Sequence, residues 1–204
     1  MALSVLGKEL ARKTWHVLIL IYLACFLYLG QATFVRWMAL WSVVVVAVET
    51  VRLNVPAAQR LLLGVFGPIV REREINRYSG IVYTTFGVLG AAAFWGREPR
   101  VVAAAVLCLA LADAAAALVG IAFGRLRFQI RGQTRSVEGS AAGFVVAWLC
   151  GAGAGLPFWA RLAGAVVVTA IDVVPIPPDD NLWIPLASAA AFGAATGVWP
   201  ALPL

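Results

Sequence analysis

The chain alternates between long runs of apolar residues and short segments that carry charge. Seven runs stand out, and only Arg36 and Asp113 place a charge inside them: 14–31, 34–48, 78–96, 101–124, 139–160, 162–171 and 181–204. A helix needs about 20 mainly apolar residues to cross the roughly 30 Å hydrocarbon core of a bilayer. The pattern therefore predicts an all-α, polytopic integral membrane bundle of about seven transmembrane helices. It indicates a single domain over residues 1–204, because no repeat or linker divides the chain.

Two short runs need separate interpretation. The sixth run, 162–171, is short for a crossing, so it either spans the membrane or lies at its interface. The segment 61–70 lies between Arg60 and Arg71 and is too short to cross, which predicts an additional interfacial helix.

Composition supports a membrane protein and excludes other classes. Hydrophobic residues make up 62% of the chain and charged residues 13%, against about 45–50% and about 25% in an average soluble domain. A soluble domain of this size could not bury so much apolar surface. The formal charge of +6 comes from cations spread between the apolar runs, which favours membrane orientation and phosphate contacts over a nucleic-acid surface.

The positions of the cations predict the orientation. If the N-terminus is cytoplasmic, most cations fall in the inside segments 8–13, 52–77 and 125–135. The outside segments then hold fewer cations, namely Arg36, Arg97, Arg100 and Arg161. Lys and Arg are enriched in cytoplasmic loops, so we expect this orientation. The C-terminus then lies outside if all seven runs cross, and inside if the sixth run does not.

Asp113 is the clearest functional candidate. An acid at the centre of a spanning helix costs about 2.5–3.5 kcal/mol on insertion scales, so intramembrane acids are functional candidates by default. Gly120 and Gly124 follow on approximately the same helix face and lead to an Arg-rich loop. This strip would let a ligand approach closely, although packing of helices through small residues also explains the glycines.

Other polar residues form small groups at the ends of the runs. Glu9, Arg12 or Lys13, and His16 recur at three- and four-residue spacing, so they share one helix face as it enters the membrane. His16 is the one histidine in the sequence, and an anchoring role for it is the alternative to a functional one. Glu49 and Arg52 form an intrahelical pair, and Glu74 lies in a mixed-charge run typical of a solvated loop.

The fifth and seventh runs begin with polar groups of their own. Ser136 is placed to cap a helix, with Glu138 in its first turn. Capping also explains Asp180 or Asn181, but it does not account for Asp172.

Under the predicted orientation every acid except Glu98 lies at or opens toward the cytoplasmic side. A transporter would place its polar groups near the midplane. Carboxylates, Arg and a divalent metal gathered at one face are what phosphoryl transfer from a nucleotide requires. The sequence has neither a P-loop nor the glycine-rich loop of protein kinases.

Taken in order, these residues resemble the family of dolichol kinases, phytol kinases and CTP-dependent diacylglycerol kinases. The resemblance spans nearly the whole chain and rests on residues 9–16, 49–52, 74–80, 113–124, 135–140, 172 and 180–181. The family usually has Lys at the position of Arg135, often Gly at that of Ala112 and commonly Glu at that of Asp172. The compact chain fits the shorter family members, which indicates a prokaryotic cell membrane.

The resemblance implies a kinase that uses CTP as phosphoryl donor and Mg²⁺ as cofactor, and that phosphorylates a long-chain isoprenoid alcohol such as a polyprenol, dolichol, phytol or geranylgeraniol. It implies Mg²⁺ ligands among Asp113, Glu138 and Asp180, and a catalytic role for Asp113 with either Asp172 or His16 as the base. Nucleotide and phosphate contacts are implied for Arg12, Lys13, Gly120, Gly124, Arg135, Ser136, Gly139 and Asn181, with Arg125, Arg127 or Arg131 nearby. Glu9, Glu49, Arg52 and Glu74 are implied as supporting residues.

The sequence is also compatible with other functions. A CTP-dependent diacylglycerol kinase or an enzyme like phosphatidate cytidylyltransferase would present similar motifs, and a small-solute transporter belongs to a different class. The sequence leaves the acceptor lipid and the oligomeric state open, because the runs that would contact the lipid tail consist mainly of Ala, Val and Leu.

Overall fold

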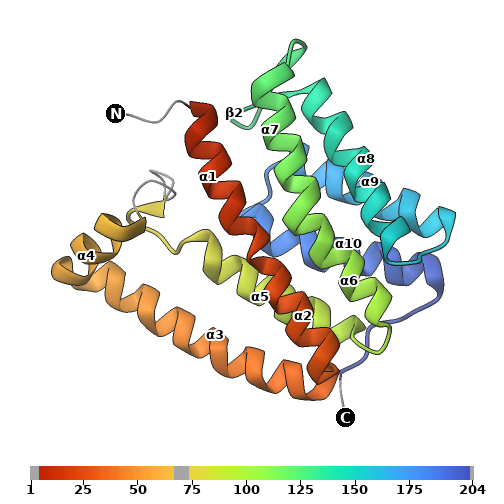
Figure 1. The fold of residues 1–204 in the computed structure, drawn as a ribbon, viewed down its shortest axis with the longest axis horizontal. Helices are drawn as coiled ribbons and strands as arrows, with labels where there is room; N and C mark the ends of the chain where they lie inside the picture. The colour runs from red at the N-terminus through yellow and green to blue at the C-terminus, as the bar shows by residue number, and fades with distance from the viewer. Residues whose placement is uncertain (1–4, 67–73, 203–204) are drawn as a thin grey trace.

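The computed structural model describes residues 5–66 and 74–202, which fold almost entirely into helices (Figure 1). In chain order the helices are α1 (Val5–Val17), α2 (Ile19–Leu29), α3 (Gln31–Asn54), α4 (Pro56–Phe66), α5 (Gly80–Trp95), α6 (Pro99–Leu107), α7 (Asp113–Phe123), α8 (Val137–Gly153), α9 (Phe158–Val173) and α10 (Asp180–Thr196). A π-helical turn, Cys108–Ala112, joins α6 to α7. The predicted all-α class is confirmed.

One short hairpin interrupts the helices in the part of the chain that the structure describes. Strands β1 (Arg127–Ile130) and β2 (Gln133–Ser136) are antiparallel, with Arg127 opposite Ser136. Arg131 and Gly132 turn the chain with positive φ angles of 47° and 76°. The hairpin projects beyond the ends of α7 and α8 (Figure 1).

Each of the seven predicted runs contains a helix, but seven membrane crossings are not confirmed. Within the described residues, three helices are long and apolar enough to cross a membrane: Glu9–Leu29, Gln31–Asn54 and Pro99–Phe123. The helices α5, α8, α9 and α10 are 16 or 17 residues long. Such helices rise about 24–26 Å, which is less than the roughly 30 Å hydrocarbon core. The predicted short helix in 61–70 begins earlier, at Pro56, and residues 67–70 lie outside the described part of the chain.

Local sequence signals explain where the helices begin and end. Gly30 adopts φ 73° between α2 and α3, a conformation that glycine reaches without strain. Pro99 lies in the first turn of α6, and the Glu98 side chain accepts a hydrogen bond from Arg100 N–H, so the helix start is capped. Ser136 and Asp179 cap α8 and α10 in the same way.

The segment from α6 through the π-helical turn lies at the centre of the bundle. Val101, Val102, Ala105 and Leu109 are fully buried there, in contact with the surrounding helices. The π-helical turn ends immediately before Asp113. Single π-helical turns inside α-helices are frequent at functional sites. The π-helical turn therefore points to Asp113, the residue that the sequence also identifies as the clearest functional candidate.

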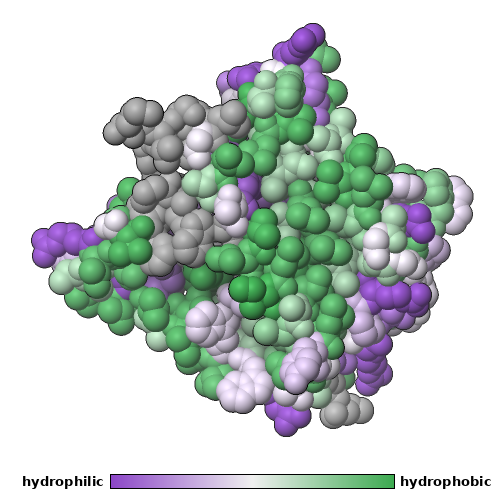
Figure 2. All heavy atoms as spheres, in the orientation of Figure 1, coloured by the Kyte–Doolittle hydropathy of each residue, from purple (hydrophilic) through white to green (hydrophobic). Residues whose placement is uncertain are grey.

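The outer surface is largely apolar. Figure 2 shows hydrophobic side chains over the middle of the molecule and hydrophilic ones at several places around its edge. Large apolar side chains of α2 and α3 face outward, among them Ile21, Trp37 and Val43. Such a broad exposed apolar surface is what a protein surrounded by lipid presents.

Candidate functional site

Asp113 lies in a buried group of charges that joins α1 to α7. The Lys13 ammonium donates a hydrogen bond to Asp113 Oδ2, and His16 Nδ1 lies 3.6 Å from the same oxygen. Lys13 is 3% exposed and Asp113 is 6% exposed. Lys13 and His16 are three residues apart, so both reach Asp113 from one face of α1. A buried carboxylate is tolerated at this depth because opposite charge accompanies it.

A second ion pair lies close to the first. Arg135 Nη1 of strand β2 lies 3.4 Å from Asp172 Oδ1, in the last turn of α9. The charges of Asp113, Asp180 and Lys13 also act on the Asp172 carboxylate. The structure thus brings three predicted acids, Asp113, Asp172 and Asp180, into one electrostatic environment with two cations. We call Lys13, His16, Asp113, Arg135 and Asp172 the charged cluster.

The start of α8 is held against α7 by a tight glycine contact. A Cβ on Gly139 would lie 2.6 Å from the Ala116 carbonyl oxygen and 3.0 Å from Gly120 Cα. Ser136 Oγ accepts a hydrogen bond from Gly139 N–H at 3.1 Å, which caps α8. A Cβ on Gly124 would lie 2.8 Å from Ser136 Oγ. The predicted glycines therefore bring the start of α8 and the end of α7 into direct backbone contact.

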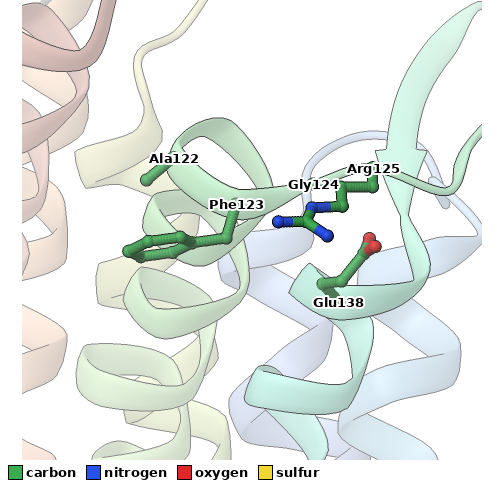
Figure 3. Close-up of a pocket in the computed structure, with 5 residues that line it drawn as sticks. All are labelled: Ala122, Phe123, Gly124, Arg125 and Glu138. Atoms are coloured by element: carbon green, nitrogen blue, oxygen red, sulfur yellow. The ribbon is translucent and has the colours of Figure 1, made fainter.

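A small pocket of about 470 Å³ opens beside this contact (Figure 3). Its lining residues are Ala122, Phe123, Gly124, Arg125 and Glu138. The Arg125 and Glu138 side chains extend into the same space, whereas the Phe123 ring points away from them (Figure 3). Leu126 N–H donates to Glu138 Oε1 at 3.1 Å. The pocket thus places the Arg125 guanidinium, a donor that can bind an anion, beside the Glu138 carboxylate at the start of helix α8.

Glu138 does not lie beside Asp113. Its neighbour Gly139 packs on Gly120, which follows Asp113 by seven residues, or about 10 Å along the helix. Across residues 5–66 and 74–202, no three or more His, Cys, Asp or Glu side chains form a group that could hold a metal ion. The proposed trio of Asp113, Glu138 and Asp180 is therefore not assembled in advance as a protein-only metal centre.

Glu49 and Arg52 form more than a surface pair. Arg52 donates to both Glu49 carboxylate oxygens, at 2.8 and 3.0 Å, and both side chains are buried. Arg52 also donates to three backbone carbonyls, those of Glu74, Ile75 and Arg77. Ser79 N–H donates to Glu49 Oε2 at 2.8 Å. The pair therefore fixes the segment before α5 against the end of α3.

Asn181 lies where α10 and α5 begin. Asp179 caps α10 by accepting a hydrogen bond from Asn181 N–H at 3.1 Å. A Cβ on Gly80 would lie 2.8 Å from Asn181 Nδ2 and 3.9 Å from Glu74 Oε1. The glycine at position 80 therefore leaves space for the Asn181 amide next to the Glu49–Arg52 pair.

A groove of about 520 Å³ runs between α1–α2, α3, α4 and α5. Along α3 its lining changes from Trp41, Val44 and Val48 to Glu49 and Arg52. Along α1–α2 the lining changes in the matching direction, from apolar residues of α2 to polar ones of α1. From α2 to α1, the lining residues are Tyr22, Ile21, Ile19, Leu18, His16 and Arg12. The groove is thus apolar along most of its length and polar at the end nearest the charged cluster.

Several features of this site are not evident from the sequence. Trp41 Nε1 donates to the Tyr22 hydroxyl at 2.8 Å, and that hydroxyl lies 3.5 Å from Thr85 Oγ1. No sequence spacing links these three residues, which come from three different helices. The alternation of polar and apolar residues across 125–131, followed by Gly132, is a signal that could have predicted the hairpin.

Comparison with known proteins identifies three curated relatives, each called CTP-dependent diacylglycerol kinase 1. The protein from Schizosaccharomyces pombe is 31% identical over 160 residues, which cover 69% of this chain and 71% of the relative. The one from Saccharomyces cerevisiae is 26% identical over 141 residues, covering 68% of this chain and 47% of the relative. The one from Eremothecium gossypii is 31% identical over 102 residues, covering 50% of this chain and 31% of the relative.

The chain thus spans about a third and about half the length of two of these relatives. No family model matches the chain. No solved structure matches it.

Proposed function

The chain belongs to the family of dolichol kinases and CTP-dependent diacylglycerol kinases, and we propose that it transfers the γ-phosphoryl group of CTP to the hydroxyl of diacylglycerol. The reaction takes place at the cytoplasmic membrane face, where the predicted orientation puts the hairpin. The names of the three relatives favour diacylglycerol over the isoprenoid alcohols that the resemblance first implied.

The observation that carries the proposal is the position of the charged cluster. It lies between the pocket that contains Arg125 and a groove suited to an apolar chain. Lys13 and Arg135 supply positive charge, and His16 lines the groove while lying 3.6 Å from Asp113. A kinase that joins a soluble polyanion to a lipid needs this arrangement, because its two substrates arrive from different solvents.

The nucleotide binds at the hairpin end. Arg125 and the Ser136 hydroxyl offer donors to phosphate oxygens, and the glycine contact lets the nucleotide approach the backbone closely. Arg135 supports this assignment, because its Nε is buried without a hydrogen-bond partner among the described residues. A phosphate oxygen would satisfy that donor.

The residues present also fit a Mg²⁺ ion bound together with CTP. Mg²⁺ usually takes one or two carboxylates and completes its shell with water and substrate phosphates, so three protein ligands are not required. Asp113 and Asp180 are the two carboxylates that would hold it. Glu138 lies nearer the nucleotide pocket. When bound, the ion offsets the negative charge on the transferring phosphate.

His16 is the base in this proposal. Its Nδ1 faces the Asp113 carboxylate, which favours a proton on Nδ1 and leaves Nε2 to accept the proton of the lipid hydroxyl. The hydroxyl oxygen forms a bond to the γ-phosphorus of CTP while the bond to the β-phosphate oxygen breaks. The products are CDP and the phosphorylated lipid. Asp172 pairs with Arg135 and orients that cation toward the phosphates.

The test is a transfer assay with the purified full chain in lipid micelles. With γ-labelled CTP and Mg²⁺, the label is expected in phosphatidic acid when diacylglycerol is present, and a chelator should stop the transfer reversibly. Transfer to a polyprenol or phytol, with none to diacylglycerol, would refute the proposal that diacylglycerol is the acceptor. Release of pyrophosphate from CTP and phosphatidate would favour a cytidylyltransferase. Solute flux through proteoliposomes without nucleotide use would exclude the kinase.

A further inference from the structure

The groove between α1–α2, α3, α4 and α5 is large and lies between helices that can span a membrane, and the phosphoryl transfer alone does not require such a groove. Its volume of about 520 Å³ falls within the roughly 300–1,000 Å³ of ordinary ligand sites. Its walls come from the first two helices that are long enough to span a membrane, Glu9–Leu29 and Gln31–Asn54. A cavity between such helices is in contact with the bilayer rather than with water.

Resting on the proposed function, we propose that this groove is the binding site of the acceptor diacylglycerol. The lipid enters sideways from the bilayer between α2 and α3, and its hydroxyl comes to rest at His16. Three independent features of the groove support this assignment: its opening, its polarity and its end point.

The groove opens toward lipid. Ile21 on α2 and Val44 and Val48 on α3 line it, yet these side chains are 56%, 43% and 49% exposed. Residues that both line a cavity and form the outer surface mark the place where that cavity meets its surroundings. Because these surroundings are apolar over α2 and α3, an acyl chain can pass from the bilayer into the groove without crossing water.

The polar end of the groove matches a glycerolipid better than a prenol. A diacylglycerol carries two ester groups beside its hydroxyl, whereas a prenol carries a hydroxyl alone. Arg12, which also donates to Glu9, and Asn181 line this end with side-chain N–H groups, and Gly80 leaves space beside the Asn181 amide. Sites built to hydrogen-bond a substrate discriminate against analogues that lack the partner group. A prenol would leave these donors without ester oxygens.

The groove ends at the charged cluster. His16 lines the groove, and its Nδ1 lies 3.6 Å from Asp113 Oδ2. A hydroxyl at this end therefore lies next to the residue that the proposed reaction needs as its base. The apolar chains extend in the opposite direction along Val45 and Val48, so one bound lipid satisfies both ends of the site.

The test compares two tryptophan substitutions on α3. Val48→Trp places an indole in the groove, whereas Val43→Trp places one on the lipid-facing surface outside it, because Val43 is 66% exposed and does not line the groove. Val48→Trp is expected to raise the KM for diacylglycerol by about tenfold or more and to leave the KM for CTP unchanged. Val43→Trp should behave like the parent. Val44→Trp serves as a second groove variant if Val48→Trp does not fold.

A binding readout separates this inference from the proposed reaction. A photoreactive diacylglycerol is crosslinked to the full chain without CTP, and the labelled peptides are identified by mass spectrometry. Label on α2 and α3 that Val48→Trp removes and Val43→Trp keeps supports the groove, even if no phosphoryl transfer is found with any lipid. Normal transfer by Val48→Trp with undiminished labelling refutes the groove and leaves the kinase proposal standing. Stronger labelling by a photoreactive polyprenol than by diacylglycerol refutes the glycerolipid assignment.

Discussion

Lys13 and Asp113 are one hundred residues apart in the sequence, yet the Lys13 ammonium donates directly to the Asp113 carboxylate in the interior of the bundle. The contact attaches the N-terminal helix to α7, just after the π-helical turn. His16 approaches the same carboxylate from the next turn of α1. The Asp113 carboxylate therefore both holds α1 in place and takes part in the chemistry proposed for the site.

Asp113→Asn is expected to abolish phosphoryl transfer and to lower the free energy of unfolding by about 3–5 kcal/mol, because the Lys13 charge would remain buried without its partner. The double variant Lys13→Met/Asp113→Asn removes both charges. It should recover most of the lost stability and remain inactive. Transfer from labelled CTP and unfolding in detergent micelles measure the two effects separately. Activity in the double variant would show that Asp113 serves packing alone.

Gly139→Ala is expected to weaken CTP binding and to destabilise the protein by about 1–3 kcal/mol, since the added Cβ would meet the Ala116 carbonyl at 2.6 Å. Gly153→Ala, on the same helix, is the matched control, because its Cβ meets nothing within 4 Å. Alanine is the better helix former, so the control should be neutral or slightly stabilising. The KM for CTP and the unfolding midpoint distinguish the two variants, and equal behaviour would disprove the role of the contact between α7 and α8.

The sequence predicts the helices and several local contacts well, because these depend on residues close together in the chain. Charge-free runs place the helices, since a buried charge is costly in a membrane. The Ser136 cap and the Glu49–Arg52 pair follow from spacings of three residues. Asp113 stands out because nothing in its own run offsets its charge.

Contacts between helices could not be predicted in the same way. The spacing of Lys13 and His16 gives their shared face, but only the packing of α1 on α7 shows that this face meets Asp113. The direction of Glu138 depends on the segment before the hairpin, where Leu126 N–H donates to its carboxylate. The groove depends on the angle between α2 and α3. No local sequence pattern predicts that angle.

Arg52→Lys is expected to lower the free energy of unfolding by about 1.5–3 kcal/mol. A single ammonium cannot replace a guanidinium that holds Glu49 with two nitrogens and also reaches three backbone carbonyls. The segment before α5 would loosen, and the KM for the acceptor lipid should rise with it. Arg100→Lys is the control, because Arg100 pairs with Glu98 on the exposed surface. The thermal unfolding midpoint of Arg100→Lys should equal that of the parent. An equally unchanged midpoint for Arg52→Lys would contradict the structural role proposed for the hydrogen bonds of Arg52.

The C-terminus is expected on the membrane side opposite the hairpin. Asp172, at the end of α9, contacts Arg135 in the hairpin, so α9 returns to the hairpin side and α10 leads away from it. Ala201 N–H donates to the Phe94 carbonyl oxygen, so the described residues after α10 lie beside the end of α5, whereas the start of α10 lies beside the start of α5. This arrangement favours a crossing by the sixth run over an interfacial position.

Single cysteines test this topology after Cys25, Cys108 and Cys150 are replaced by alanine. Arg97→Cys and Trp199→Cys should react with a membrane-impermeant maleimide in intact cells, whereas Gln129→Cys in the hairpin should react only after permeabilisation. This orientation is predicted from the distribution of Lys and Arg, which are enriched in cytoplasmic segments. If Trp199→Cys is protected while Arg97→Cys reacts, the sixth run does not cross. If Gln129→Cys reacts in intact cells, the orientation is reversed, and cytosolic CTP could not reach the hairpin.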